Sequence, residues 1–136
     1  MHVTAAAVQA VADSGCLFGV IACGYQVAAL AHSKAAPPHH RPHAYDLLLL
    51  LTFVASNPSH RTDLAGQQAW APLCLPRSAP HAFHFAYVHY PSRDSPLFVA
   101  LVARGQQMFF DVHAAREPLM ESLESTGVLE ARSSDR

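Results

Sequence analysis

The sequence predicts an α+β fold with an antiparallel sheet of about five strands, one helix on one face of the sheet and C-terminal helices on the other. Three observations lead to this prediction. An apolar stretch is broken once by a glycine, a leucine-rich helical run follows it, and three extended segments precede a C-terminal helical region. The resulting order of strand, strand, helix, three strands and two helices indicates a sheet that is covered on both faces.

The leucine-rich run at residues 45–56, YDLLLLLTFVAS, is the element around which the chain is organised. It is too short to cross a bilayer, which needs roughly 20 apolar residues, and it has too few β-branched residues to favour a strand. We predict a helix with Pro42 at its first position and Asp46 near its positively polarised end. Asn57-Pro58 should end the helix, because the residue before a proline avoids the α region.

This helix has two apolar faces when its residues are placed at about 100° intervals. The broad face is expected to pack on the sheet and consists of Leu47, Leu48, Leu50, Leu51, Val54 and Ala55. Leu49 and Phe53 form a narrow second stripe, although a helix on the surface of a lone domain normally needs only one apolar face. Three interpretations of this stripe remain open. Another part of the chain covers it, a partner protein binds it, or it is a pair of apolar residues that the helix tolerates on its exposed side.

The first two strands are predicted at residues 17–23 and 25–31, as a hairpin around Gly24. Both strands are apolar on both faces, so we place them at the centre of a sheet that is covered on two sides. Residues 1–13 favour a helix and read as the end of a preceding unit.

The second half of the chain supplies the other strands and the C-terminal helices. Residues 69–77 contain two prolines, which permit only a short or edge strand. Strands are also predicted at 82–90 and 97–103, and the second of these is apolar throughout. A helical region follows at 106–126, where Pro118 is expected to kink the helix or split it into two pieces.

Composition argues against several classes of function. The chain has 136 residues, of which 51% are hydrophobic and 14% charged, and its net charge is -1 with neutral histidines. Without a basic field, neither nucleic acid nor an anionic membrane is expected as a direct partner. A membrane anchor in the uncharged segment 15–31 is a further alternative, and it would require the chain to partition into detergent. The segment lacks preceding Lys or Arg residues and is interrupted by Gln26, so two strands explain it better.

The three cysteines, Cys16, Cys23 and Cys74, form no C-x-x-C pair, which favours free thiols in a reducing compartment. Cys74 lies between prolines in an apolar segment, so we expect a packed thiol rather than an activated one. The sequence contains no G-x-S-x-G elbow and no phosphate-binding loop. It therefore gives no argument for catalysis, and no catalytic residue is assigned.

Ten histidines raise the hypothesis of a metal site. They include two clusters, His39, His40 and His43 and then His81, His84 and His89. The first cluster lies in a proline-rich loop, and His84 and His89 should point to opposite faces of one strand. Zinc sites need ligands that converge, so we expect solvated or half-buried histidines and assign no metal ligand or cofactor.

Several motifs, taken in their order and spacing, resemble one known family. They are Trp-x-Pro-Leu-Cys-Leu-Pro-Arg at 70–77, Phe-x-x-Ala-Tyr-Val-x-Tyr at 83–90, His-Ala-Tyr-Asp-Leu at 43–47 and Gln-Met-Phe-Phe at 107–110. With the hairpin at 16–31, these pieces resemble the vacuolar fusion protein Mon family, which is related to the Fuzzy and Hermansky–Pudlak trafficking proteins. The likeness covers about residues 15–127 and is to the second of the three longin domains in that family.

The resemblance implies a longin-like, profilin-like fold and a domain organisation. Residues 1–14 would be the remnant of a preceding helix, 15–127 the longin domain and 128–136 a flexible tail. Together with the Ccz protein, Mon proteins form a guanine-nucleotide exchange factor for a late-endosomal Rab GTPase in fusion with the vacuole or lysosome. In this family the nucleotide-opening surface belongs to the first longin domain, and a third longin domain would follow Glu130, so the resemblance implies a scaffolding role here.

The resulting expectation is a non-enzymatic interaction domain that is cytoplasmic and reaches late-endosome or vacuole membranes only through its complex. Its expected partners are a Ccz-type longin protein and other Mon longin domains, and indirectly a late-endosomal Rab GTPase. Leu49, Phe53 and the open sheet edge would form the contacts. The alternative is a small longin-like or profilin-like module that binds a ligand or a metal ion through its histidines.

Overall fold

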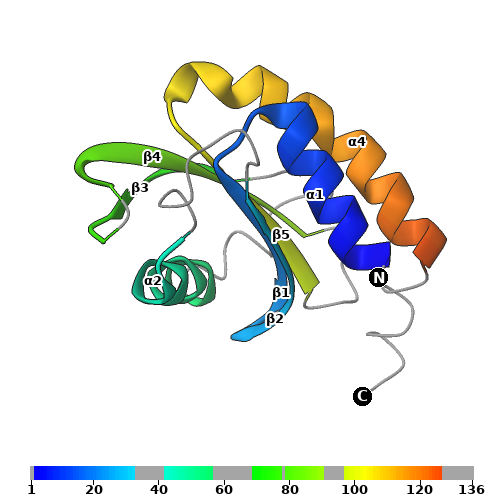
Figure 1. Cartoon of the computed structure of the whole chain (residues 1–136), viewed down its shortest axis with the longest axis horizontal. Helices are drawn as coiled ribbons and strands as arrows, with labels where there is room; N and C mark the ends of the chain where they lie inside the picture. The colour runs from blue at the N-terminus through cyan, green and yellow to red at the C-terminus, as the bar shows by residue number, and fades with distance from the viewer. Residues whose placement is uncertain (1, 33–41, 57–68, 78, 91–96, 127–136) are drawn as a thin grey trace.

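The computed structural model describes residues 2–32, 42–56, 69–77, 79–90 and 97–126. Figure 1 shows its elements in chain order. They are α1 (His2–Ser14), β1 (Phe18–Cys23), β2 (Gln26–His32), α2 (Ala44–Ala55), β3 (Ala69–Leu75), β4 (Ala79–His89), β5 (Leu97–Ala103), a short 3-10 helix η2 (Gln106–Met108) and α4 (Phe109–Thr126).

The strands form one 5-stranded sheet in the order β2-β1-β5-β4-β3, and every pair of neighbours is antiparallel. Helix α2 lies on one face of this sheet, while α1 and α4 lie side by side on the other (Figure 1). β5 is buried along its whole length because it is central and covered on both faces, as its continuous apolar sequence requires. The predicted α+β architecture with about five antiparallel strands is confirmed.

Two hydrophobic cores result from the alternation of side chains across the sheet. The core under α1 and α4 contains, among others, Ala6, Ala7, Ala10, Val11, Ile21, Tyr87, Val99, Leu101, Val112, Leu119 and Leu123. The core under α2 contains, among others, Phe18, Val20, Leu50, Leu51, Val54, Leu75, Val88, Phe98 and Val102. Helices α1 and α4 close the first core and α2 closes the second, each with an apolar stripe that meets the inward residues of alternate strand positions.

The first hairpin turns at Gly24, whose φ of 61° lies in the left-handed region that glycine adopts without strain. This confirms the predicted hairpin, but the central position predicted for both strands holds only for β1. β2 is an edge strand, and Val27 on it is exposed. The apolar residues that β2 buries most deeply are Ala29 and Ala31, which α1 covers, so no further strand is needed to bury them.

Helix α2 begins at Ala44, two residues later than the sequence predicts. His43 is its N-cap, and the Nδ1 atom of His43 accepts a hydrogen bond of 3.0 Å from the backbone N–H of Tyr45. Pro42 therefore lies outside the helix, one residue before the cap, because His43 supplies the side-chain acceptor for the free N–H groups of the first turn. Ser56 is the C-cap, and the predicted stop at Asn57-Pro58 lies outside the described residues.

Helix α4 is a single helix that contains Pro118, so the split that was one of the two expected outcomes is wrong, while the kink that was the other stays a prediction. A proline removes the hydrogen bond to the carbonyl of the residue four positions earlier, which is Ala114. Both Ala114 and Pro118 are exposed, so that carbonyl lies on the solvent side of the helix and water can replace the lost donor.

Helix α1 shares the core of the sheet, since Ala7, Ala10 and Val11 are buried against it. Gly19 of β1 lets α1 approach closely. A Cβ atom at this position would lie 2.7 Å from Cδ2 of Leu101 and 3.1 Å from Cγ2 of Val11. The domain boundary expected at 14/15 stays a prediction, and the tail expected at 128–136 lies outside the described residues.

Candidate interaction surfaces

The buried side of α2 is narrower than the predicted broad face. Leu50, Leu51 and Val54 are buried and Leu47 is half-buried, whereas Leu48 is 51% exposed. The predicted burial of Leu48 and Ala55 is therefore wrong. The helix is rotated toward Asp46, which is fully buried, and this rotation turns Leu48 and Ala55 away from the sheet.

Asp46 and Arg77 explain this rotation. The Oδ1 atom of Asp46 accepts a hydrogen bond of 3.2 Å from the backbone N–H of Arg77, just beyond the end of β3. The guanidinium carbon of Arg77 also lies 5.5 Å from the centre of the Tyr45 ring, so Arg77 and Tyr45 form a cation–π contact. The sequence predicts Asp46 only as a charge near the helix N-terminus. Its tie to a residue 31 positions away is a tertiary contact that local patterns do not reveal.

Leu49 and Phe53, the residues predicted to meet a partner, are both half-buried. Phe53 packs partly against the core under α2, and it also takes part in a further interaction. Leu49 belongs to neither hydrophobic core among the described residues. Part of the stripe is thus covered within the chain, and its role as a contact for a partner stays a prediction.

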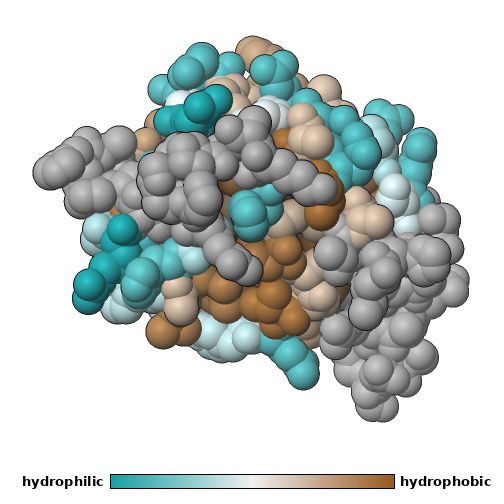
Figure 2. Space-filling model, viewed as in Figure 1, coloured by the Kyte–Doolittle hydropathy of each residue, from teal (hydrophilic) through white to brown (hydrophobic). Residues whose placement is uncertain are grey.

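Other apolar side chains are exposed near α2. The phenol of Tyr25, at the tip of the first hairpin, donates a hydrogen bond of 3.4 Å to Oγ1 of Thr52 on the outer side of the helix. Tyr25 itself is 57% exposed, and Tyr45 and Val27 are also exposed. Figure 2 shows hydrophobic residues gathered on the face between α2 and the β1–β2 hairpin.

The sheet has two edges, β2 and β3, among the strands that the structure describes. The prediction that residues 69–77 form a short or edge strand is confirmed. Pro72 has no backbone N–H to donate, and the β3 register shifts between Cys74 and Leu75. In β2, a similar shift leaves Ala28 without a register partner on β1. Prolines and bulges of this kind limit unspecific pairing of edge strands.

The buried histidines lie on opposite faces of β4, as the sequence predicts. Burial lowers the pKa of His84 on the α2 side, and the charge of Asp46 opposes this shift. Burial lowers the pKa of His89 on the α4 side to about 4, and the neighbouring Arg116 and His113 contribute to this lowering. The Nδ1 atoms of both histidines are buried and have no hydrogen-bond partner among the described residues.

These positions bear on the alternative of a metal site. Because the sheet separates His84 from His89, the two side chains cannot bind the same ion. His43 caps α2, while His39, His40 and the side chain of His81 lie outside the described residues. Within the described part of the chain, no group of three His, Cys, Asp or Glu residues is arranged to hold a metal ion.

The three cysteines are free and differ in exposure. Burial raises the pKa of Cys16 to about 11, against the opposing effect of a hydrogen bond with Ser14. Cys74 is exposed, so the predicted packing of its thiol is wrong. It lies on the edge strand β3, on the face that carries α1 and α4, at a point where no described helix buries it.

None of the described helices has the length and apolarity that a membrane crossing requires. In the described part of the chain, both faces of the sheet are packed against helices and several apolar side chains are exposed.

Comparison with known proteins identifies the family of this fold. Residues 14–121 match the family described as the second longin domain of FUZ, MON1 and HPS1. The vacuolar fusion protein MON1 homologue of Oryza sativa subsp. japonica is 32% identical over 91% of this chain, and that of Arabidopsis thaliana is 34% identical over 93%. MON1 homologue A of Gallus gallus is 30% identical over 82% of the chain.

The chain spans about a fifth of the length of these relatives, with shares of 20%, 19% and 19%. Among solved structures, the gliding protein MglB of Thermus thermophilus has the same fold, with a TM-score of 0.59 and 15% sequence identity. The superposition covers 91% of this chain and 90% of the MglB chain. By its matched residues and its relatives, the chain belongs to the family of second longin domains of FUZ, MON1 and HPS1, and it is of the MON1 type.

Proposed function

We propose that the chain is a non-enzymatic interaction domain of a MON1-type protein that acts in vacuolar fusion. One observation carries this proposal. Helix α2 closes its own core with Leu50, Leu51 and Val54, yet it keeps Leu48 and Leu49 at least partly exposed. Apolar surface beyond what the core needs is the usual mark of a protein–protein contact.

Within this role, we propose that the domain is a scaffold in a complex of the MON1-type protein with a Ccz-type longin protein. That complex would act as a guanine-nucleotide exchange factor for a late-endosomal Rab GTPase. Neighbouring longin domains would cover the Leu49/Phe53 stripe and one edge of the sheet. The domain would be cytoplasmic and reach late-endosome or vacuole membranes through the complex. The family assignment and the two open sheet edges among the described strands support this proposal.

The test is co-purification of the chain with a Ccz-type partner or with the remaining MON1 longin domains. We expect Leu49→Asp combined with Phe53→Asp to abolish binding, because two charges would be buried in an apolar contact. Ala55→Asp is the matched control, since it places the same charge on the same helix at an exposed position that belongs neither to the stripe nor to the exposed leucines. Wild-type binding by the double variant would exclude the stripe, and equal loss in the control would move the contact to another side of α2.

Phe53 packs partly on the core, so the double variant needs a check of its fold. Far-UV circular dichroism and thermal unfolding provide this check. Leu49→Asp alone keeps the test informative, because Leu49 belongs to neither core among the described residues.

A further inference from the structure

A group of polar side chains lies between α4 and β4. Tyr87 and His89 are two positions apart on the face of β4 that α4 covers, and both side chains are almost fully buried. His113 and Arg116 are three positions apart on α4, so they lie on the same side of the helix. The Nδ1 atom of His113 is 2.9 Å from the phenol oxygen of Tyr87, and this contact joins the helix to the strand.

Two nitrogen atoms of this group are buried and unpaired. They are Nδ1 of His89 and Nε of Arg116, and neither has a hydrogen-bond partner among the described residues. The side chain of His89 is only 5% exposed, so water does not replace the missing partner from the surface. Buried polar atoms are almost always paired in folded proteins. Two unpaired nitrogens in one cluster therefore indicate a place where a ligand atom can bind.

The charges that act within this group are all basic. Burial raises the pKa of Tyr87 to about 12, and the charge of Arg116 opposes this shift. Burial lowers the pKa of His89, and Arg116 and His113 lower it further. No described carboxylate contributes to either shift. Glu117 follows Arg116 but is exposed on another side of α4, because successive residues of a helix are about 100° apart. The group thus holds a guanidinium ion without a counter-charge beside it.

The group contains more hydrogen-bond donors than acceptors. Because its pKa is raised, the phenol of Tyr87 keeps its proton at neutral pH and can donate it to Nδ1 of His113. His113 then carries its own proton on Nε2, which becomes a donor. Arg116 offers a planar fork of N–H groups, and His89 adds a further donor in the tautomer that carries its proton on Nδ1. An acceptor with a negative charge is the ligand that satisfies this set.

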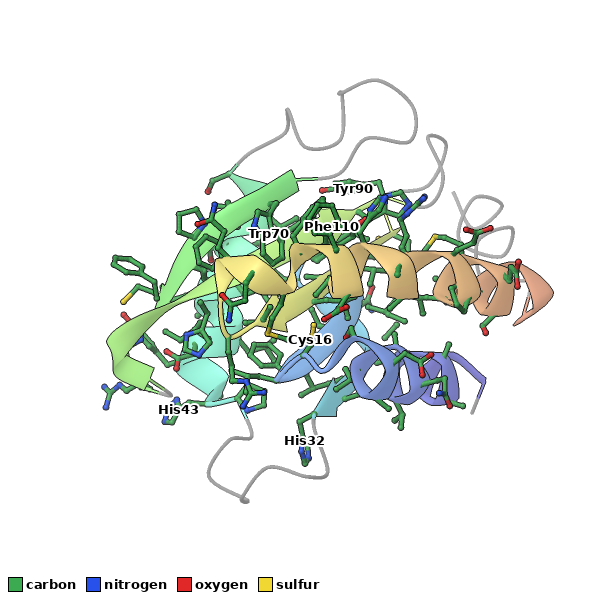
Figure 3. The ribbon with its side chains drawn as sticks, turned by 90° about the horizontal axis from the view of Figure 1, so that it is seen from above. Cys16, His32, His43, Trp70, Tyr90 and Phe110 are labelled. Atoms are coloured by element: carbon green, nitrogen blue, oxygen red, sulfur yellow. The ribbon has the colours of Figure 1, made fainter. Side chains whose placement is uncertain are left out.

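We propose that Arg116, His113 and His89 bind a small oxyanion, a phosphate or carboxylate group, between α4 and β4. The guanidinium fork matches two oxygen atoms of either group. His113 and Arg116 are half-buried, so the anion enters beside them and reaches His89 behind them. Figure 3 shows Tyr90, the residue after His89, on the side of α4 opposite α1, so α1 does not close this entrance. The site lies on the other face of the sheet from α2 and is independent of the function proposed above.

Nuclear magnetic resonance of the histidine ring nitrogens tests this proposal on the intact chain. The chain, labelled with 15N-histidine, is titrated near neutral pH with inorganic phosphate and separately with acetate, at an ionic strength held constant with sodium chloride. We expect saturable shifts at His89 and His113, with the His89 proton on Nδ1 in the bound state. His84 lies on the other face of the sheet and should not shift. Saturation by phosphate alone would assign a phosphate group, and saturation by acetate a carboxylate.

Two arginine variants test the role of the guanidinium. Arg116→Gln should raise the Kd for the anion at least about tenfold, because it removes the charge-assisted hydrogen bonds. Arg104→Gln is the matched control, since it removes the same charge from an exposed arginine just after β5, and its Kd should equal that of the wild type. Circular dichroism checks that each variant is folded.

Two results would overturn the proposal. One is the absence of saturable shifts at His89 and His113 with both anions. The other is equal weakening by Arg116→Gln and Arg104→Gln, which would reduce the effect to the attraction of the whole chain for anions. The titration of the wild type reads the site directly, so it decides the proposal even if Arg116→Gln fails to fold.

Discussion

Acid should destabilise this chain through His89. The side chain is only 5% exposed, and burial together with the charges of Arg116 and His113 lowers its pKa from 6.5 to about 4. Between these two values the unfolded chain binds a proton at this site and the folded chain does not. The free energy of unfolding therefore decreases as the pH falls from 6.5 toward 4.

The size of the effect follows from the two pKa values. Proton linkage for one site with these values gives a loss of about 2 kcal/mol between pH 7 and pH 5, and about 3 kcal/mol by pH 4. Because the side chain is almost fully buried, little of this is removed by solvent screening. A domain of this size is typically stable by about 5–15 kcal/mol, so the loss is large enough to measure.

Urea unfolding at pH 7 and pH 5, followed by the emission of Trp70, measures this loss. The variant His89→Gln has no proton to bind at this site, so the difference in unfolding free energy between wild type and variant isolates His89 from the carboxylates. We expect this difference to change by about 2 kcal/mol between the two pH values, in the direction that disfavours the wild type in acid. His84→Gln should show a smaller change, because Asp46 opposes the effect of burial on His84.

A difference that does not depend on pH would refute this reasoning. It would mean that His89 binds a proton equally well in the folded and in the unfolded chain. The side chain would then reach solvent or a hydrogen-bond partner in the folded chain, contrary to the buried site described above.

Three further predictions concern packing and thiol chemistry. Gly19→Ala should lower the free energy of unfolding by about 1–3 kcal/mol, because the new Cβ would lie 2.7 Å from Cδ2 of Leu101, and an unchanged thermal unfolding temperature would contradict this. Asp46→Ala should cost about 1–3 kcal/mol in urea unfolding, since the backbone N–H of Arg77 loses its acceptor, while Asp46→Asn keeps an acceptor and should cost less. Ellman's reagent at pH 8 should label Cys74 in the folded chain, but Cys16 only after unfolding. The reason is that Cys16 is buried and its thiol has a pKa of about 11. Rapid labelling of Cys16 in the native state would disprove its burial.

The order and type of the elements could be predicted because they depend on local patterns. A continuous apolar run bounded by turns gives the central strand Leu97–Ala103, and Gly24 marks the sharp turn between the first two apolar segments. The leucine run gives α2 to within a residue or two at each end. The motifs at 70–77 and 83–90 also indicated the family from sequence alone.

The surfaces could not be predicted in the same way. Phe83 and Phe85 alternate along a strand as core residues do. Phe83 is nevertheless exposed, because α1 and α4 do not extend over the edge strand β3 and the part of β4 beside it. Cys74 is exposed for the same reason. The partner role of Leu49 and Phe53 stays a prediction, since the structure places both at intermediate burial.

The sequence by itself determined which segments become strands and helices, because hydrophobic period, prolines and glycines act within a few residues of each other. Only the tertiary structure decided that β2 is an edge strand, that Asp46 rather than Leu48 turns inward, and that the rings of Phe83 and Phe110 stay exposed. These outcomes depend on how many helices are available to cover a sheet and on contacts such as that between Asp46 and Arg77, which join residues far apart in the chain.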